Sequence, residues 1–272
     1  MSQKNAGADD LVSRYGPWCL VAGASTGIGK SFSEQLANKG FNLVMLALPG
    51  SGLSELADGL ADRYAVQTQI IELDLAAADL VDTIAPITGE LDIGLLIYVA
   101  CHSVIGEFTS TPLNDKLKII DVNVKGPIRL ISHLTPFLEK REKSGIILMS
   151  SMSGWQGTAM VSTYAASKAF TTNLAEGLWT ELAPKGIDVL ALVAGATHTP
   201  TFDRLTPVNK QQSVFPMQAD EVVREALANL GRKPTHIAGW LNRLIGFMTN
   251  RVLSRKVAVR FISANTERVY FK

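Results

Sequence analysis

Short apolar runs alternate along the chain with longer stretches in which apolar residues recur at helical spacing. The runs that favour β-strands lie at residues 18–22, 42–46, 67–71, 93–99, 145–149 and 188–193. The patterns that favour helices lie at residues 28–39, 52–63, 77–84, 112–140, 163–183 and 220–230. Nearly continuous apolar strands with helices between them are typical of a parallel sheet buried on both faces. The pattern therefore predicts an α/β fold, a doubly wound parallel sheet in three layers.

The same pattern predicts one domain. Residues 1–13 are mostly polar, and we expect them to form a flexible leader. No repeat and no Pro/Gly-rich linker divides residues 14–272, and 272 residues suit one large α/β domain. With 47% hydrophobic residues the chain has enough apolar material for a sizeable core.

Charge changes this picture only near the end of the chain. The net charge is +1, which gives no reason to expect a nucleic-acid partner. Residues 232–272, the basic amphipathic C-terminal extension, nevertheless carry nine Lys/Arg and one acid, Glu267. Three interpretations are open: a helix that completes the core with solvated arginines, a lid over an apolar substrate, or a helix on a membrane surface. We favour the first of these.

Cysteine usage and the N-terminus bear on location. Cys19 and Cys101 both lie in apolar stretches, so we expect two buried thiols rather than a disulfide or a metal site. The N-terminus lacks the apolar segment of a secretory signal, and no run of about 18 apolar residues occurs. The sequence therefore predicts a cytoplasmic protein without a bound metal.

A glycine-rich turn follows the first expected strand. It has the sequence Gly23-Ala24-Ser25-Thr26-Gly27-Ile28-Gly29 and leads into a helix. Glycines permit the tight turn, the close approach of backbone to a pyrophosphate, and the packing of helix on strand. The helix N-terminus adds free N–H groups for phosphate. Such turns also occur without a ligand, but a position between strand and helix favours a dinucleotide site.

A second constellation points to proton transfer. Tyr164 and Lys168 are four residues apart on an expected helix and so lie on one face. A nearby cation favours the phenolate and lowers the tyrosine pKa, which lets the phenol exchange a proton with a substrate oxygen while hydride moves at the adjacent carbon. Ser151 closes an expected strand thirteen residues before Tyr164, where its hydroxyl could hold that oxygen. A Tyr–Lys pair alone also arises by chance, and Ser151 alone could be an ordinary turn residue.

Together these motifs resemble the short-chain dehydrogenase/reductase family, with its single Rossmann domain and Tyr-x-x-x-Lys site, from about residue 16 onward. The resemblance implies that Asp74 contacts adenine, Asn123 shapes its helix and holds a proton-relaying water, and Thr199 touches the nicotinamide carboxamide. The implied catalytic residues are Asn123, Ser151, Tyr164 and Lys168. The implied cofactor-binding residues are Gly23, Ser25, Thr26, Gly27, Ile28, Gly29, Asp74, Ala100, Asn123, Tyr164, Lys168, Gly195, Thr197 and Thr199.

Two segments depart from the family pattern. Tyr98-Val99-Ala100-Cys101 stands where the family has Asn-Asn-Ala-Gly, and Ala194-Gly195 stands where it has Pro-Gly. We interpret both as scaffold variation, because all four catalytic positions are filled. The function expected by resemblance is NAD(P)-dependent interconversion of a carbonyl and an alcohol, on an apolar keto-acyl, steroid-like or other lipid-like substrate. The alternative is a catalytically silent NAD(P)-binding regulatory or scaffold protein.

Cofactor choice and assembly complete the expectations. The segment after the second strand, Met45-Leu46-Ala47-Leu48-Pro49, offers neither an acid for a ribose hydroxyl nor an arginine for a phosphate. The missing acid slightly favours NADP(H), with Ser51 as a phosphate contact. The expected helices at 112–140 and 163–183 carry apolar residues on more than one face, which predicts a homodimer or homotetramer.

Overall fold

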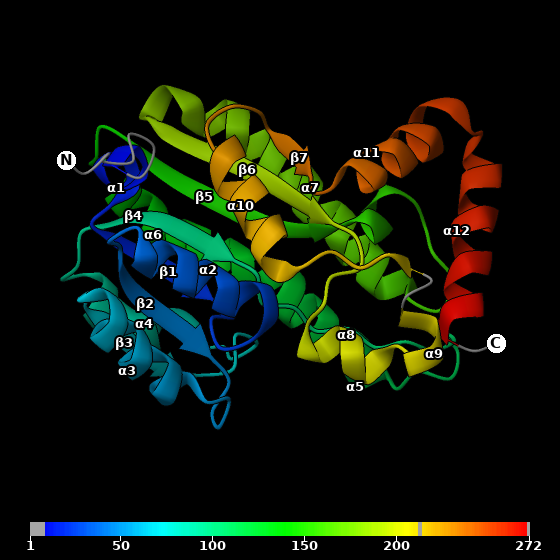
Figure 1. Ribbon diagram of the computed structural model, residues 1–272, viewed down its shortest axis with the longest axis horizontal. Helices are drawn as coiled ribbons and strands as arrows, with labels where there is room; N and C mark the ends of the chain where they lie inside the picture. Colours follow the sequence, from blue (N-terminus) through cyan, green and yellow to red (C-terminus); the bar gives the residue numbers. More distant parts are fainter. Residues whose placement is uncertain (1–8, 212–213, 271–272) are drawn as a thin grey trace, which may run out of the picture.

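The computed structural model describes residues 9–211 and 214–270. A seven-stranded sheet forms its centre, in the order β3-β2-β1-β4-β5-β6-β7, and every strand pair is parallel (Figure 1). The strands are β1 (Trp18–Ala22), β2 (Asn42–Ala47), β3 (Thr68–Glu72), β4 (Ile93–Tyr98), β5 (Ser144–Ser151), β6 (Ile187–Ala194) and β7 (Thr235–Ile237). The order reverses between β1 and β4, and open parallel sheets bind ligands at such a reversal.

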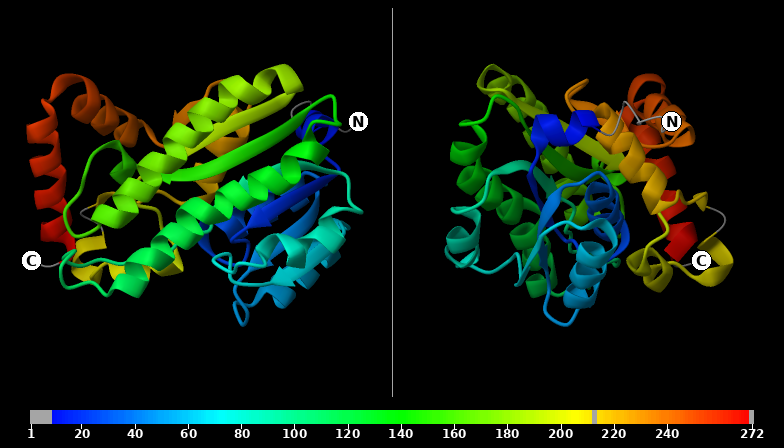
Figure 2. Two further views of the ribbon diagram at one scale, coloured as in Figure 1. Left: turned by 180° about the vertical axis from the view of Figure 1, so that it is seen from behind. Right: turned by 60° about the vertical axis from the view of Figure 1, so that its left-hand side comes forward.

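Helices cover both faces of the sheet, and Figure 2 shows α6 and α7 crossing its rear face. The front layer contains α1 (Asp9–Tyr15), α2 (Gly27–Asn38), α3 (Leu53–Tyr64) and α10 (Ala219–Asn229). The rear layer contains α4 (Leu80–Thr88), α6 (Gly126–Leu138) and α7 (Ser162–Leu182), with α5 (Leu113–Ile120) leading into α6. The predicted three-layer, doubly wound α/β fold in a single domain is therefore confirmed.

Alternation along the strands explains why the layers form. On β1, Cys19 and Val21 pack into the front core, whereas Leu20 and Ala22 pack into the rear core, because successive side chains of a strand point to opposite faces. All four are fully buried. The sequence therefore shows a continuous apolar run rather than an alternating one.

The expected flexible leader is wrong for its last residues. Residues 9–13 belong to α1, and residues 1–8 lie outside the described part of the chain. Leu11 and Val12 pack against the front core, and the fully buried Tyr15 donates a 2.7 Å hydrogen bond from its hydroxyl to Asp188 Oδ2. Leu11, Val12 and Tyr15 form too short an apolar pattern to predict a packed helix from the sequence of this mostly polar stretch.

The helix expected at 112–140 is interrupted by a π-helical turn, η1 (Asp121–Lys125), between α5 and α6. The Tyr98 hydroxyl reaches this turn and donates to the carbonyl of Val122 at 2.6 Å. A Cβ at Gly126 would overlap that hydroxyl, so the glycine makes room for it. Tyr98, which departs from the family pattern, is therefore a buried link between β4 and the helix.

After Ala194 the chain forms several further elements, and the last two helices among them lie in the extension where a helix was expected. These elements are α8 (Pro200–Leu205), α9 (Val208–Gln211), β7, α11 (Trp240–Phe247), a π-helical turn η5 (Met248–Val252) and α12 (Arg255–Tyr270). The α11 and α12 helices stand at one end of the molecule (Figures 1 and 2). Within the described residues, no helix is long and apolar enough to cross a membrane.

The prediction of two buried thiols is half right. Cys19 is fully buried, and burial raises the pKa of its thiol. Cys101 is exposed, because it follows β4 in the loop at the carboxyl edge of the sheet rather than inside the strand. Among the described residues no group of three or more His, Cys, Asp and Glu side chains is arranged to hold a metal ion.

Candidate active site

The glycine turn between β1 and α2 is shaped by close backbone contacts. Gly23 has a φ of +92°, and a Cβ there would lie 2.7 Å from the backbone nitrogen of Ala100. A Cβ at Gly29 would overlap the carbonyl oxygen of Gly23. Gly27 has a φ of +54° and faces Thr199, whose Cγ2 would be 2.8 Å from a Cβ on it. The turn is therefore a cradle in which side chains at 23 and 29 cannot be accommodated.

The loop after β6 forms the opposite side of this cradle. Thr199 caps α8, because its Oγ1 accepts a 3.1 Å hydrogen bond from the Phe202 N–H. Thr197 is buried and donates from its hydroxyl to the Gly195 carbonyl at 3.2 Å. The structure thus brings the predicted residues of the first and sixth strand ends together.

Asn242 of α11 is a site neighbour that the sequence did not reveal. Its side-chain amide lies against Gly195, where a Cβ would meet its Oδ1 at 2.5 Å and its Nδ2 at 2.8 Å. Its Nδ2 donates to the Ala238 carbonyl at 2.8 Å. Asn242 belongs to no motif and lies far from Gly195 in sequence, so no signal marked it.

The Tyr–Lys pair lies on α7 beside the end of β5. Lys168 is buried, and its Nζ donates a 2.9 Å hydrogen bond to the Met149 carbonyl while lying 5.6 Å from the centroid of the Tyr164 ring. Ser150 Oγ donates to the Lys168 carbonyl at 2.8 Å and so ties the helix to the strand. Ser151 points the other way, and its Oγ accepts from the Ser153 N–H at 3.2 Å. The adjacent serines thus have separate roles.

The charge balance at Tyr164 differs from the expectation. Burial raises the pKa of the phenol, the nearby Cys101 raises it further, and a hydrogen bond with Ser151 lowers it only in part. Burial also lowers the pKa of Lys168. The pKa of Tyr164 is therefore raised, not lowered as expected, because burial is the largest influence on the phenol. Tyr164 holds its proton at neutral pH.

Asn123 lies in the η1 turn and joins two other segments. Its Oδ1 accepts from the His102 N–H at 2.8 Å, and its Nδ2 donates to the His102 carbonyl at 2.9 Å and to Ser167 Oγ at 3.0 Å. Both amide hydrogens are thus used within the protein. Asn123 fixes the loop after β4 against α7, beside Lys168.

Asp74 follows β3 at the same edge of the sheet. Its Oδ1 accepts from the Ala76 N–H at 2.9 Å, and its Oδ2 lies 3.3 Å from Lys118 Nζ. Burial opposes ionisation of this carboxyl, but the Ala76 hydrogen bond and Lys118 outweigh burial and lower its pKa. Asp74 is therefore a fixed, ionised group.

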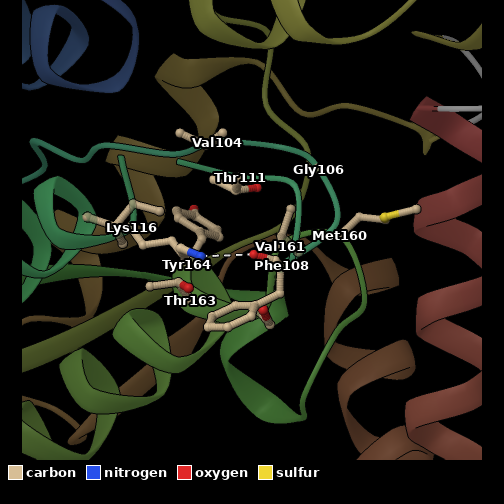
Figure 3. A pocket seen from close by; sticks show the side chains of 11 residues that line it. Val104, Gly106, Phe108, Thr111, Lys116, Met160, Val161, Thr163 and Tyr164 are labelled. Carbon is tan, nitrogen blue, oxygen red and sulfur yellow. Dashed lines mark hydrogen bonds between the residues drawn. The ribbon is translucent and has the colours of Figure 1, made fainter. Parts of the chain in front are cut away.

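Two recesses flank these residues. One lies beside Tyr164, between the loop after β4 and residues 160–163, and its lining mixes apolar side chains with polar ones such as Thr111, Lys116 and Thr163 (Figure 3). Lys116 crosses its rim, donating to the Phe108 carbonyl at 2.9 Å. The other lies beside the glycine turn and is polar, with Ser25, Lys30, Ser51 and Arg63 among its lining residues. Ser51 Oγ is buried there without a hydrogen-bond partner.

Comparisons with known proteins agree with this geometry. The family model described as short chain dehydrogenase matches residues 17–210. A 7beta-hydroxysteroid dehydrogenase from Clostridium sardiniense is 30% identical over 230 residues, which cover 85% of this chain and 88% of the relative.

Solved structures give the same result. One from work on 7beta-hydroxysteroid dehydrogenase stereoselectivity has a TM-score of 0.87 and 29% identity, and the match covers 93% of this chain and 98% of that one. A short-chain dehydrogenase from Sphingobium yanoikuyae in complex with NADPH has a TM-score of 0.73 and 28% identity, with 82% of this chain and 87% of that one covered. The chain belongs to the short-chain dehydrogenase/reductase family and is an NAD(P)-dependent oxidoreductase that interconverts a carbonyl and an alcohol.

Proposed function

We propose that the protein acts on a bulky apolar ketone or alcohol of the steroid or a related lipid-like class and uses NADP(H). The observation that carries this proposal is the position of the protonated Tyr164 at a recess whose lining includes the apolar side chains of Val104, Phe108, Ile119 and Met160 beside polar ones. An apolar wall binds hydrocarbon by removing its surface from water. The similarity to 7beta-hydroxysteroid dehydrogenases supports the same substrate class.

In the proposed reduction, Tyr164 donates its proton to the substrate carbonyl oxygen, and Ser151 hydrogen-bonds to the same oxygen. Lys168, held by the Met149 carbonyl, keeps a cation next to the ring and stabilises the phenolate that is left. Asn123 keeps the loop after β4 and α7 in register around it. A nicotinamide cofactor held by these residues would supply the hydride for the carbonyl carbon, and the product would be the alcohol.

The glycine cradle fits a dinucleotide, since it leaves backbone uncovered at a helix N-terminus. We assign cofactor binding to the whole predicted set in and around this cradle. The turn contributes Gly23, Ser25, Thr26, Gly27, Ile28 and Gly29, and the other strand ends contribute Asp74, Ala100, Asn123, Tyr164, Lys168, Gly195, Thr197 and Thr199.

The preference for NADP(H) rests on the polar recess. Lys30 and Arg63 contribute two cations to the recess that Ser51 also lines, and the buried hydroxyl of Ser51 has no hydrogen-bond partner. Glu34 and Glu55 line the same recess, with Glu34 lying 3.8 Å from Lys30. No acid stands at Ala47 or Leu48 to repel a phosphate. The Sphingobium relative was solved with NADPH, which agrees with this preference.

A homodimer or homotetramer would use the rear layer. Leu117, Ile128 and Trp179 are large apolar residues that stay exposed on α5, α6 and α7. Pairing of these helices with the same helices of a second copy would bury them and brace α7, which carries Tyr164.

The test is a turnover assay with NADPH and with NADH on steroid ketones, bulky aryl ketones, short-chain ketones and sugars, followed by absorbance of the reduced cofactor. We expect kcat/KM to be highest with NADPH and a bulky apolar ketone. Cofactor binding without turnover on any substrate would support the silent binding protein instead. Highest activity on sugars would contradict the substrate class.

A further inference from the structure

Most large apolar residues of α11 and the turn after it lie on the side that faces away from the protein, whereas Leu241 and Ile245 are half-buried. Asn242, Gly246 and Thr249 face the body, and a Cβ at Gly246 would lie 3.0 Å from Ile237 Cδ1 and 3.6 Å from Met152 Cε. Trp240, Leu244, Phe247 and Met248 follow the spacing i, i+4, i+7, i+8 and are exposed, Trp240 by 71% and Phe247 by 57%. A surface helix normally shows the opposite arrangement.

The outward side of α12 continues the same composition. Ala258 and Val269 are buried against the protein, whereas Val257 and Phe261 are exposed, Phe261 by 59%. Arg260 and Arg268 are exposed at neighbouring helical positions. Both helices lie at the same end of the molecule (Figures 1 and 2). This end therefore combines exposed apolar side chains with cations.

The segment is not a loose tail. The Ala159 N–H donates to Ser263 Oγ at 3.0 Å, and Arg255 Nη1 donates to the Trp155 carbonyl at 2.7 Å. Both bonds hold α12 to the residues between Ser151 and Tyr164, and Figure 3 shows Met160 extending toward this helix. The outward apolar side is thus presented on a docked element next to the mouth of the active site.

Charge distinguishes the occupants that could cover this side. Residues 232–272 carry nine Lys/Arg and one acid. A two-fold contact with a second copy would bring this positive segment against itself, which costs energy through like-charge repulsion. A bilayer surface rich in anionic lipid offers hydrocarbon for the apolar residues and headgroups for the cations.

We propose that the outward side of α11 and α12, with Trp240, Leu244, Phe247, Val257 and Phe261 at its centre, is a docking surface for anionic membranes. The helices lie in the plane of the lipid surface, and their arginines and lysines contact the headgroups. Docking brings the mouth of the active site to the lipid. This proposal does not depend on the proposed substrate class, because membrane binding is measured without turnover.

The experiment is flotation of the full chain with vesicles of phosphatidylcholine alone and of phosphatidylcholine mixed with phosphatidylglycerol. We expect the protein to float with the mixed vesicles, to stay behind with the neutral ones, and to be released by salt. Binding should also shift Trp240 fluorescence to shorter wavelength, and Trp240→Phe should remove most of that shift.

Matched variants identify the surface. Leu244→Gln with Phe247→Gln should lower the partition constant at least ~10-fold, because the apolar contact is lost. Lys256→Glu with Arg260→Glu should lower it about 10-fold or more. Ile70→Gln on β3, and Lys140→Glu with Lys185→Glu, are controls at exposed positions elsewhere and should change it less than ~2-fold.

Three outcomes would overturn the proposal. One is no flotation of the native protein with mixed vesicles, and a second is flotation that the α11 and α12 variants leave unchanged. The third is light scattering that shows an oligomer which Leu244→Gln with Phe247→Gln dissociates, since a second copy would then cover this surface.

Discussion

The glycine turn and the C-terminal extension contact neighbouring residues of one loop, Thr199 and Gly195, but are specified in different ways. At the turn, backbone atoms of β1, β4 and α2 approach so closely that a single Cβ at Gly23 or Gly29 has no space. In the extension, Asn242 and Gly246 of α11 face the protein while Trp240, Leu244 and Phe247 face outward. The structure of the turn depends on the identity of single residues, whereas the properties of the extension depend on which residue types together make up its exposed surface.

Tyr164→Phe should produce the largest effect, because it removes the proton donor and leaves the ring in place. We expect kcat to fall by ~10²-fold or more with little change in the unfolding temperature. By comparison, Leu244→Gln with Phe247→Gln on α11 should leave kcat on a water-soluble ketone within a few-fold of the native value. Near-native turnover of the Tyr164→Phe protein would contradict the proposed chemistry.

Gly29→Ala tests the turn itself. Its Cβ would overlap the Gly23 carbonyl, so the helix must shift away from the strand, and we expect nucleotide affinity to fall ~10-fold or more and the free energy of unfolding to fall by about 2 kcal/mol. Gly177→Ala on α7 is the control, since a Cβ there meets nothing within 4 Å. Nucleotide titration and thermal unfolding measure both. Equal behaviour of the two variants would show that the turn tolerates side chains.

Lys168→Met separates the cation from the burial that raises the tyrosine pKa. Alcohol oxidation needs the phenolate, so its rate rises as pH rises through the pKa of Tyr164. Without the cation, burial acts with less opposition, and this rise should move to higher pH. Lys168→Arg keeps the charge and should shift the profile less. An unmoved profile with Lys168→Met would leave the lysine only its hydrogen bond to Met149.

Disrupting assembly through the rear layer should have an intermediate effect on activity. Ile128→Glu with Trp179→Glu places charges on the exposed apolar positions of α6 and α7, which should shift a dimer or tetramer to monomer at micromolar concentration. Activity should fall with it, since α7 carries Tyr164 and Lys168. Light scattering and turnover are measured on the same samples. A fully active native monomer would refute the oligomer.

Ser263→Ala should have the smallest effect. It removes the acceptor of the Ala159 N–H and so loosens α12 from the residues that precede Tyr164. We expect KM for a bulky ketone to rise up to ~5-fold, about the value of one hydrogen bond, with kcat unchanged. Thr266→Ala on the same helix removes only a bond to the Ile262 carbonyl and serves as control.

The sequence predicted the parts of the molecule in which apolar residues recur periodically, and the glycine turn, where close backbone contacts exclude side chains. Strands β1 to β6, the helices between them and the placement of Tyr164 and Lys168 on α7 agree with expectation, because burial on both faces leaves continuous apolar runs and because residues four apart share a helical face. The short strand β7, only three residues long, has no such signal.

Other features depend on contacts between distant segments. The exposure of Cys101, the pKa of Tyr164 and the position of Asn242 are set by which loop folds over which strand end. The helical spacing in the extension was visible, but periodicity alone does not say which side of a helix faces the protein. Of the three interpretations we favoured a helix whose apolar side completes the core, whereas the structure leaves Trp240, Leu244 and Phe247 of α11 exposed.

The Asn123 side chain has a consequence for motion within the cleft. Its amide exchanges hydrogen bonds in both directions with His102, as a peptide unit does with a neighbouring strand, and a third bond reaches Ser167 on α7. The loop after β4 and the catalytic helix are thus coupled like adjacent strands, and we expect them to move as one rigid body.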